Sequence, residues 1–197
     1  MLACLSGTLL LASRPSGAEP TSTDADSIYD VWPWIDGAVI VGTNAVTLGL
    51  YGFGSGLIHP SCPCDPESVN AFDRHAIGKH SDTALAVGTA TAVLSAVVPL
   101  ALDAWDLRRL RPVLEDATVL AEALSITGAL TTVTKFTVQR PFPRTYAGDP
   151  RLVSKPDGYH SFYSGHTATT FAALGVASMT VGRRYQLHVI PWLVTAA

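Results

Sequence analysis

The segment Ala84–Leu102, ALAVGTATAVLSAVVPLAL, contains no Asp, Glu, Lys or Arg, and it is as long as a helix that crosses a bilayer. Three further windows share this character: Gly37–Ile58, Ala117–Thr134 (which carries only Glu122) and Tyr163–Gly182. Buried helices of soluble proteins are usually shorter and keep a polar stripe. We therefore predict an all-α fold, a multi-pass membrane helical bundle with four full apolar helices. A soluble helical bundle with a large core is the alternative.

The composition narrows the functional classes. The chain has 197 residues, of which 48% are hydrophobic and 15% charged, and its net charge is −3. A typical soluble domain has about 25% charged residues. A chain with this apolar content is not expected to be disordered. Because the sequence has no block of basic residues, we also expect no nucleic-acid partner.

The two ends of the chain are harder to interpret. Residues 1–31 form an N-terminal leader: Met1–Ala12 is apolar, and Ser16-Gly17-Ala18 resembles a signal-peptide cleavage site, although no basic residue precedes it. A cleaved signal and a retained leader both remain open. Residues 32–197 form the helical domain, which we expect to be incomplete at its C-terminus. Its last apolar stretch, Tyr185–Ala197, is too short to span and predicts a truncated fifth helix.

One loop between the first two windows is rich in residues that bind zinc: His59, Cys62, Cys64, His75 and His80. We expect no metal there. A second Cys pair is missing, and His75 and His80 are five residues apart, so they do not share a helix face. A Cys62–Cys64 disulfide is disfavoured, because bridging residues so close in sequence strains its geometry.

The loops predict a membrane orientation. The arginine-rich turn at residues 106–112 and the pair Arg183-Arg184 fall on one side if every window spans, and short basic loops mark the cytoplasm. Residues 59–83 and 135–162 then share the opposite side. We expect that side to face the periplasm or exterior of an inner or plasma membrane.

Basic residues gather in the outward loop. Lys135 stands at the end of the third window, and Arg140 and Arg144 follow it closely. Such side chains supply positive charge to a phosphate, arginine in bidentate fashion. Taken singly, a basic residue at a membrane boundary more often extends to lipid headgroups.

The fourth window begins with Ser164, Gly165 and His166. Ser164 is a good helix N-cap, Gly165 lets the backbone approach a ligand, and the free N–H groups of a helix start bind an oxyanion. His166 is a proton donor near neutral pH. Alone, each feature is more often a simple cap or a solvated histidine. Together with the upstream basic residues, they predict a phosphate site with His166 as its catalytic residue.

At this point the sequence resembles the type-2 phosphatidic acid phosphatase superfamily, which includes lipid phosphatases, bacterial acid phosphatases and vanadium haloperoxidases. The family's first motif is Lys, six residues, then Arg-Pro. Here Lys135 and Pro143 match it, but Phe142 replaces the motif arginine. The second motif, Pro-Ser-Gly-His, stands here as Tyr163-Ser164-Gly165-His166. The resemblance covers about residues 37–197. It implies phosphate binding by Lys135, Ser164 and Gly165, with Arg140 or Arg144 replacing the missing arginine.

The family's third motif, Ser-Arg, five residues, His, three residues, Asp, is absent from residues 1–197; His188 does not fit it. In relatives that histidine is the nucleophile, and the second-motif histidine protonates the leaving group. The resemblance thus implies a phosphohydrolase for a lipid phosphate or isoprenoid pyrophosphate, acting through a phosphohistidine, without metal or cofactor. As written, the chain is expected to show little or no turnover.

Two other functions stay open: a secreted acid phosphatase or vanadate-dependent haloperoxidase of the same fold, and a non-catalytic membrane protein with a remnant phosphate site. The expected partners are a phosphorylated lipid or small phosphate ester, together with membrane lipid. Oligomeric state is not predicted.

Overall fold

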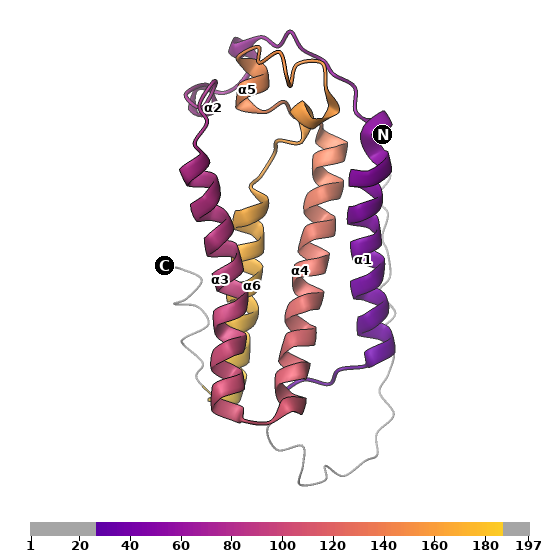
Figure 1. Ribbon diagram of the computed structural model, residues 1–197, viewed down its shortest axis with the longest axis vertical. Coiled ribbons are helices and arrows are strands. Elements are labelled where there is room, and N and C mark those ends of the chain that lie inside the picture. The colour runs from indigo at the N-terminus through magenta and orange to yellow at the C-terminus, as the bar shows by residue number, and fades with distance from the viewer. Residues whose placement is uncertain (1–26, 187–197) are drawn as a thin grey trace, which may run out of the picture.

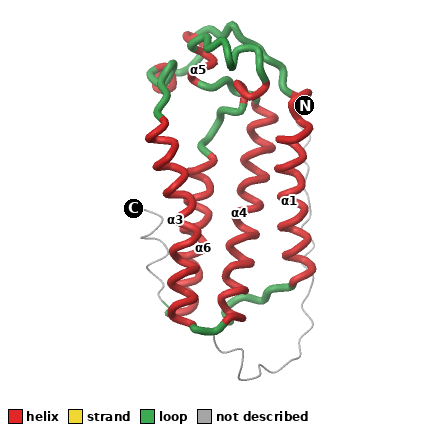
Figure 2. The backbone as a smooth tube through the Cα atoms, in the orientation of Figure 1, coloured by secondary structure: helices red, strands yellow, loops and turns green. Residues whose placement is uncertain are grey.

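The computed structural model describes residues 27–186. Four long helices run alternately up and down: α1 (Pro33–Phe53), α3 (Asp82–Leu107), α4 (Leu110–Val138) and α6 (Gly165–Arg184) (Figure 1). The described range contains no strand, only an isolated bridge between Arg140 and Ser161 (Figure 2). The predicted all-α class is confirmed.

The short elements gather at one end of the bundle, which we call the loop end (Figure 1). They are η1 (Gly54–Leu57), η2 (Pro66–Ser68), α2 (Ala71–Arg74), α5 (Pro143–Tyr146) and η3 (Pro156–Tyr159). Residues 59–83 and 135–162, which the sequence predicts to share one side, therefore lie at the same end of the bundle. The arginine-rich turn between α3 and α4 lies at the opposite end, which we call the turn end.

Within residues 27–186, three helices are long and apolar enough to cross a membrane: Pro33–Leu57, Asp82–Leu107 and Leu110–Val138. The fourth predicted window does form a helix, α6, of 20 residues, but α6 is not among these three. α6 is rich in the small residues Ala, Thr, Ser and Gly, which let it pack closely against both α3 and α4. From residue 187 onward, the predicted fifth helix lies outside the described residues.

Large apolar side chains point outward along the spanning helices, which is the reverse of a water-soluble bundle. At the turn end, Trp34 is 91% exposed and Trp105 is 78% exposed; at the loop end, Phe53 is 90% exposed. Aromatic residues concentrate at both membrane–water interfaces of membrane proteins. The exposed side chains are thus placed as lipid-facing residues would be.

The loop end has a small core of its own, built around Tyr159. The Tyr159 side chain is fully buried and packs with Ile58 and Phe136. Its hydroxyl donates to the Val153 carbonyl oxygen at 2.7 Å and accepts from the Cys62 backbone N–H at 3.1 Å. This tyrosine therefore joins the loop after α1 to the loop before α6.

The cysteine prediction was wrong, since Cys62 and Cys64 form a disulfide. A bend at Pro63 brings their Cα atoms to 4.3 Å, close enough for the bridge. Within residues 27–186, no group of three or more His, Cys, Asp or Glu side chains is placed to hold a metal ion.

At the turn end, Arg184 joins three helices. Its Nη2 donates to Asp116 on α4 at 2.8 Å, and its Nη1 donates to Asp103 on α3 at 3.3 Å. The side chains of Arg184 and Asp116 are only 8% and 3% exposed. These ion pairs fix the last turn of α6 between α3 and α4.

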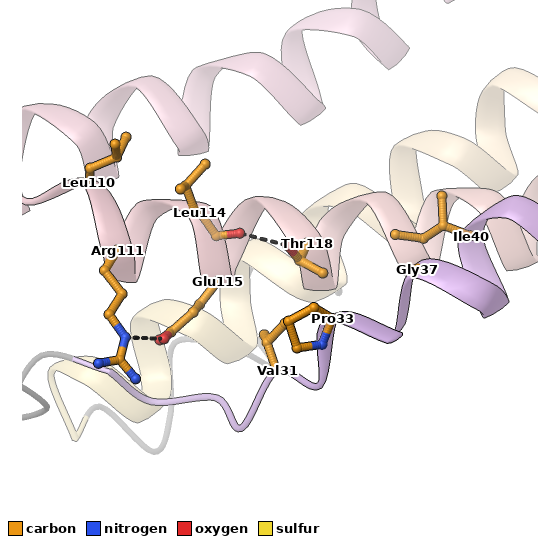
Figure 3. A pocket seen from close by; sticks show the side chains of 9 residues that line it. All are labelled: Val31, Pro33, Gly37, Ile40, Leu110, Arg111, Leu114, Glu115 and Thr118. Atoms are coloured by element: carbon orange, nitrogen blue, oxygen red, sulfur yellow. Dashed lines mark hydrogen bonds and ion pairs between the residues drawn. The ribbon is translucent and has the colours of Figure 1, made fainter. Parts of the chain in front are cut away.

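Part of the predicted leader also contacts the turn end. The Tyr29 hydroxyl lies 2.8 Å from Thr180 Oγ1, and the Arg183 guanidinium stacks over the Tyr29 ring. Beside this segment, α1 and α4 leave a hollow of about 680 Å³ with mostly apolar walls, edged by the Arg111–Glu115 ion pair (Figure 3). Residues 27–31 are thus in contact with the bundle.

Candidate phosphate site at the start of α6

The first turn of α6 is capped as the sequence predicts. Ser164 has an extended backbone, and its hydroxyl accepts from the Thr167 backbone N–H at 3.3 Å. The other N–H groups of a first helical turn have no intrahelical partner and carry the positive end of the helix dipole. In Figure 1, α6 starts deeper in the bundle than the point where α4 ends. Its start is therefore flanked by neighbouring helices.

Lys135, in the last turn of α4, lies beside this helix start. A Cβ added at Gly165 would stand 3.8 Å from Lys135 Nζ and 3.8 Å from Thr131 Cγ2. Lys135 is half-buried, and no acidic side chain within residues 27–186 pairs with its ammonium group. The structure thus brings the predicted Lys135 and Gly165 together, with positive charge and free N–H groups on the same side.

His166 faces α3. Its Nε2 lies 3.1 Å from Thr89 Oγ1, and Thr89 Oγ1 donates to the Leu85 carbonyl oxygen at 2.9 Å. A hydroxyl has one proton, so Thr89 has only lone pairs left for the imidazole. His166 Nε2 is therefore the donor and carries a proton. The His166 ring lies over Gly88 of α3, where an added Cβ would stand 3.6 Å from His166 Cγ.

Thr89 could not be identified as a site residue from the sequence. It belongs to an apolar helix with no motif around it, and it lies 77 residues before His166. Its only sequence signal is a hydroxyl within an uncharged window, which is a common feature of membrane helices.

The two predicted arginines are bound to carboxylates. Arg140 Nη2 donates to Asp73 Oδ2 at 2.7 Å, and Arg144 Nη2 donates to Asp149 Oδ2. The Arg140 hydrogen bond, with a second one from Asn70, holds the pKa of Asp73 below its ordinary value of 3.8. The described contacts of Arg140 and Arg144 therefore go to acidic side chains in the loops, not to Lys135 or His166.

Phe142, which stands where the related motif has arginine, is the N-cap residue of α5. Its backbone N–H donates to the Gly158 carbonyl oxygen at 2.9 Å, and its side chain is half-buried. This hydrogen bond ties the first motif segment to η3, a few residues before Ser164. Position 142 thus serves loop packing here and supplies no charge.

A second histidine, His160, lies near Lys135 and was also missed. Its ring packs against Phe136, with centroids 4.6 Å apart, and edge-on to Tyr51 at 5.7 Å. Burial lowers the pKa of His160, and the positive charge of Lys135 lowers it further against the opposing effect of Asp157. Its Nε2 is buried without a hydrogen-bond partner within the described residues. His160 is therefore a neutral packing residue of the loop end.

One comparison with known families gives a match. The family model of the PAP2 superfamily matches residues 116–197, which include Lys135, the loop-end segment after α4 and the start of α6. No curated protein and no solved structure matches the chain. The match supports a phosphatase-like function in general. The similarity to the PAP2 superfamily thus covers residues 116–197, from the first half of α4 through α6 and beyond.

Proposed function

We propose that this chain carries the phosphate-binding and acid–base part of a phosphohydrolase site, which takes the phosphate group of a lipid phosphate or isoprenoid pyrophosphate at the start of α6. One observation carries the proposal. The Lys135 ammonium group lies beside Gly165 without an acidic partner among the described residues, next to a histidine that carries a proton on Nε2. A half-buried cation at a helix N-terminus is a favourable place for an oxyanion.

Each group has a distinct role in this proposal. The free N–H groups of the first turn, with Ser164 and Gly165, bind phosphate oxygens, and Lys135 neutralises their charge. Arg140 and Arg144 supply further charge from the loop. The imidazolium form of His166 gives one proton to the leaving oxygen as the P–O bond to the leaving group breaks, and the ring becomes neutral. His166 then accepts a proton from the water that attacks the phosphoryl group.

The phosphoryl group passes through a phosphohistidine in this scheme, as it does in the relatives that the sequence resembles. The acceptor would be a histidine of the third motif, which residues 1–197 do not contain. Splitting the displacement into two steps is ordinary covalent catalysis. His160 is not a substitute, because its Nε2 is buried against aromatic rings.

The membrane setting supports an amphiphilic substrate. Two of the three helices of spanning length, α3 and α4, flank the site, and the site lies toward the loop end. A phosphate at the interface reaches the start of α6 while its hydrocarbon part stays in the bilayer. The basic turn containing Arg108 and Arg109 favours a cytoplasmic turn end, so we place the site on the outer side.

Extraction tests the membrane setting. Membranes carrying the chain are washed with alkaline carbonate, and the chain is expected to stay in the pellet. Release into the wash would favour a secreted phosphatase or haloperoxidase of the same fold.

Phosphate binding tests the site itself. The full chain is purified in detergent, and its affinity for inorganic phosphate is measured by calorimetry and ³¹P NMR. Lys135→Ala is expected to weaken binding by roughly tenfold or more, since hydrogen bonds to charged groups contribute about 1.5–3 kcal/mol. Lys155→Ala, an exposed lysine of the same loop, is the matched control and should bind as the wild type does. Equal affinity in the two variants would refute the proposal.

A further inference from the structure

The loop between α1 and α3 places one carboxylate against a predicted phosphate ligand. Asp73 Oδ2 accepts from Arg140 Nη2 at 2.7 Å, across 67 residues of sequence. Both side chains are 31% exposed. This is the contact through which the α2 segment reaches the arginine of the first motif segment.

Asp73 is itself held in place. Asn70 Nδ2 donates to the same Oδ2 atom at 2.7 Å, and the Asp73 backbone N–H donates to Asn70 Oδ1 at 2.9 Å. One of these hydrogen bonds holds the carboxylate, and the other ties the Asp73 backbone to the same Asn70 side chain. A carboxylate held this firmly restricts the rotamers of the long side chain that binds it.

The backbone of Arg140 leads directly to the start of α6. The Ser161 N–H donates to the Arg140 carbonyl oxygen at 3.0 Å, and Ser161 precedes the cap Ser164 by three residues. A pocket of about 120 Å³ lies at this point, and Asp73, Arg140 and Phe162 are among the residues that line it. Arg140 therefore borders a pocket, and its backbone is linked by one hydrogen bond to the segment that leads into the cap of α6.

We propose that Asp73 is a positioning residue, which holds the Arg140 guanidinium through Nη2 so that Nε and Nη1 can bind phosphate oxygens. This inference rests on the proposed function. The contact uses one nitrogen only; within residues 27–186, Nε and Nη1 have no hydrogen-bond partner. A carboxylate that merely masked the arginine would engage its two-nitrogen edge in bidentate fashion.

Positioning and charge have opposite effects on affinity, and this makes the inference testable. A carboxylate near a bound phosphate repels it, so removal of Asp73 by electrostatics alone strengthens phosphate binding. Loss of the Asp73 contact also frees Arg140 to rotate, and that freedom must be lost again on binding. We expect the positioning effect to dominate, because Arg140 would otherwise be ordered by its backbone alone.

The experiment measures the affinity of the full chain in detergent for inorganic phosphate. Asp73→Ala is expected to weaken it by about fivefold to tenfold, the scale of one fixed charge-assisted hydrogen bond. In an Arg140→Ala background, Asp73→Ala should weaken binding no further, because the positioning effect acts through Arg140 and only the favourable loss of negative charge remains. Asp65→Ala is the matched control from the same loop, since Asp65 only caps η2, and it should leave the affinity unchanged.

Asp73→Asn is the second variant, for the case in which the alanine variant fails to fold. Its amide oxygen still accepts from Arg140, so we expect a weaker but measurable loss of affinity. Unchanged or tighter phosphate binding in Asp73→Asn or in folded Asp73→Ala overturns the inference. If Arg140→Ala weakens binding while both Asp73 variants do not, the positioning role falls and the proposed function stands. If the wild type binds no phosphate, both fall.

Discussion

Replacing Arg184 by Gln is the sharpest test of how the bundle holds α6. Arg184 is 8% exposed and pairs with Asp103 and Asp116, which are 14% and 3% exposed. The substitution leaves two buried carboxylates without their cation. Breaking a buried pair by removing one partner costs about 3–5 kcal/mol. Since 1 kcal/mol shifts the melting temperature of a chain of this size by roughly 2–4 °C, we expect a fall of roughly 6–20 °C.

The assay is thermal unfolding in detergent, followed by tryptophan fluorescence. Arg183→Gln is the matched control, because Arg183 is exposed and stacks on Tyr29 with its guanidinium carbon 5.3 Å from the ring centroid. An exposed cation–π contact is worth about 0.5–1 kcal/mol, so this control should lose no more than about 4 °C.

A second substitution separates buried charge from lost packing. Adding Asp116→Asn to Arg184→Gln removes one unpaired carboxylate and should recover part of the lost stability. The reasoning is refuted if Arg184→Gln has the same melting temperature as the Arg183→Gln control. It is also refuted if the added Asp116→Asn lowers the melting temperature further.

Three further substitutions test the loop end and the site. Gly158→Ala should lower the melting temperature, because its Cβ would stand 2.4 Å from the Leu152 carbonyl oxygen; Gly175→Ala, with no atom within 4 Å, is the control, and equal melting would contradict this. Burial lowers the pKa of His160 from 6.5, so wild-type stability should fall as the pH drops from about 7.5 to about 5.5, where the unfolded chain binds the proton more readily. His160→Phe should flatten that dependence in melting experiments, and a parallel curve would count against it. Thr89→Val removes the acceptor of the His166 Nε2 proton, so ¹⁵N NMR should show Nε2–H alone in the wild type and both tautomers in the variant; a wild-type imidazole protonated at Nδ1 alone would contradict the assignment.

The long helices could be predicted from the sequence, because uncharged windows of bilayer length have few alternatives. Their ends could not be placed as well. The window Ala117–Thr134 is shorter than the helix that contains it, α4 (Leu110–Val138). The first turns of α4 are polar and include the Arg111–Glu115 ion pair, so they fall outside an uncharged window. Ser164 was identified correctly as the cap of α6, because capping depends on a few adjacent residues.

The side-chain contacts across the loop end could not be predicted from the sequence. Asp73 and Arg140 meet between a single-turn helix and a coil, neither of which has a periodic pattern. Thr89 meets His166 because α6 starts deep between its neighbours, and that depth is set by tertiary packing. The Cys62–Cys64 bridge depends on a local bend at Pro63 that residue spacing does not reveal.

The ion pairs of Arg184 also bear on the order in which the helices enter a membrane. α6 is not among the three helices apolar enough to cross alone, and its last turn carries a guanidinium that needs Asp103 and Asp116. An unpaired arginine is costly in hydrocarbon. Insertion of α6 is therefore favoured only beside α3 and α4, which precede it in the chain. Because α6 supplies the helix start that lies beside Lys135, we expect the proposed phosphate site to be assembled at this late step of biogenesis and not before.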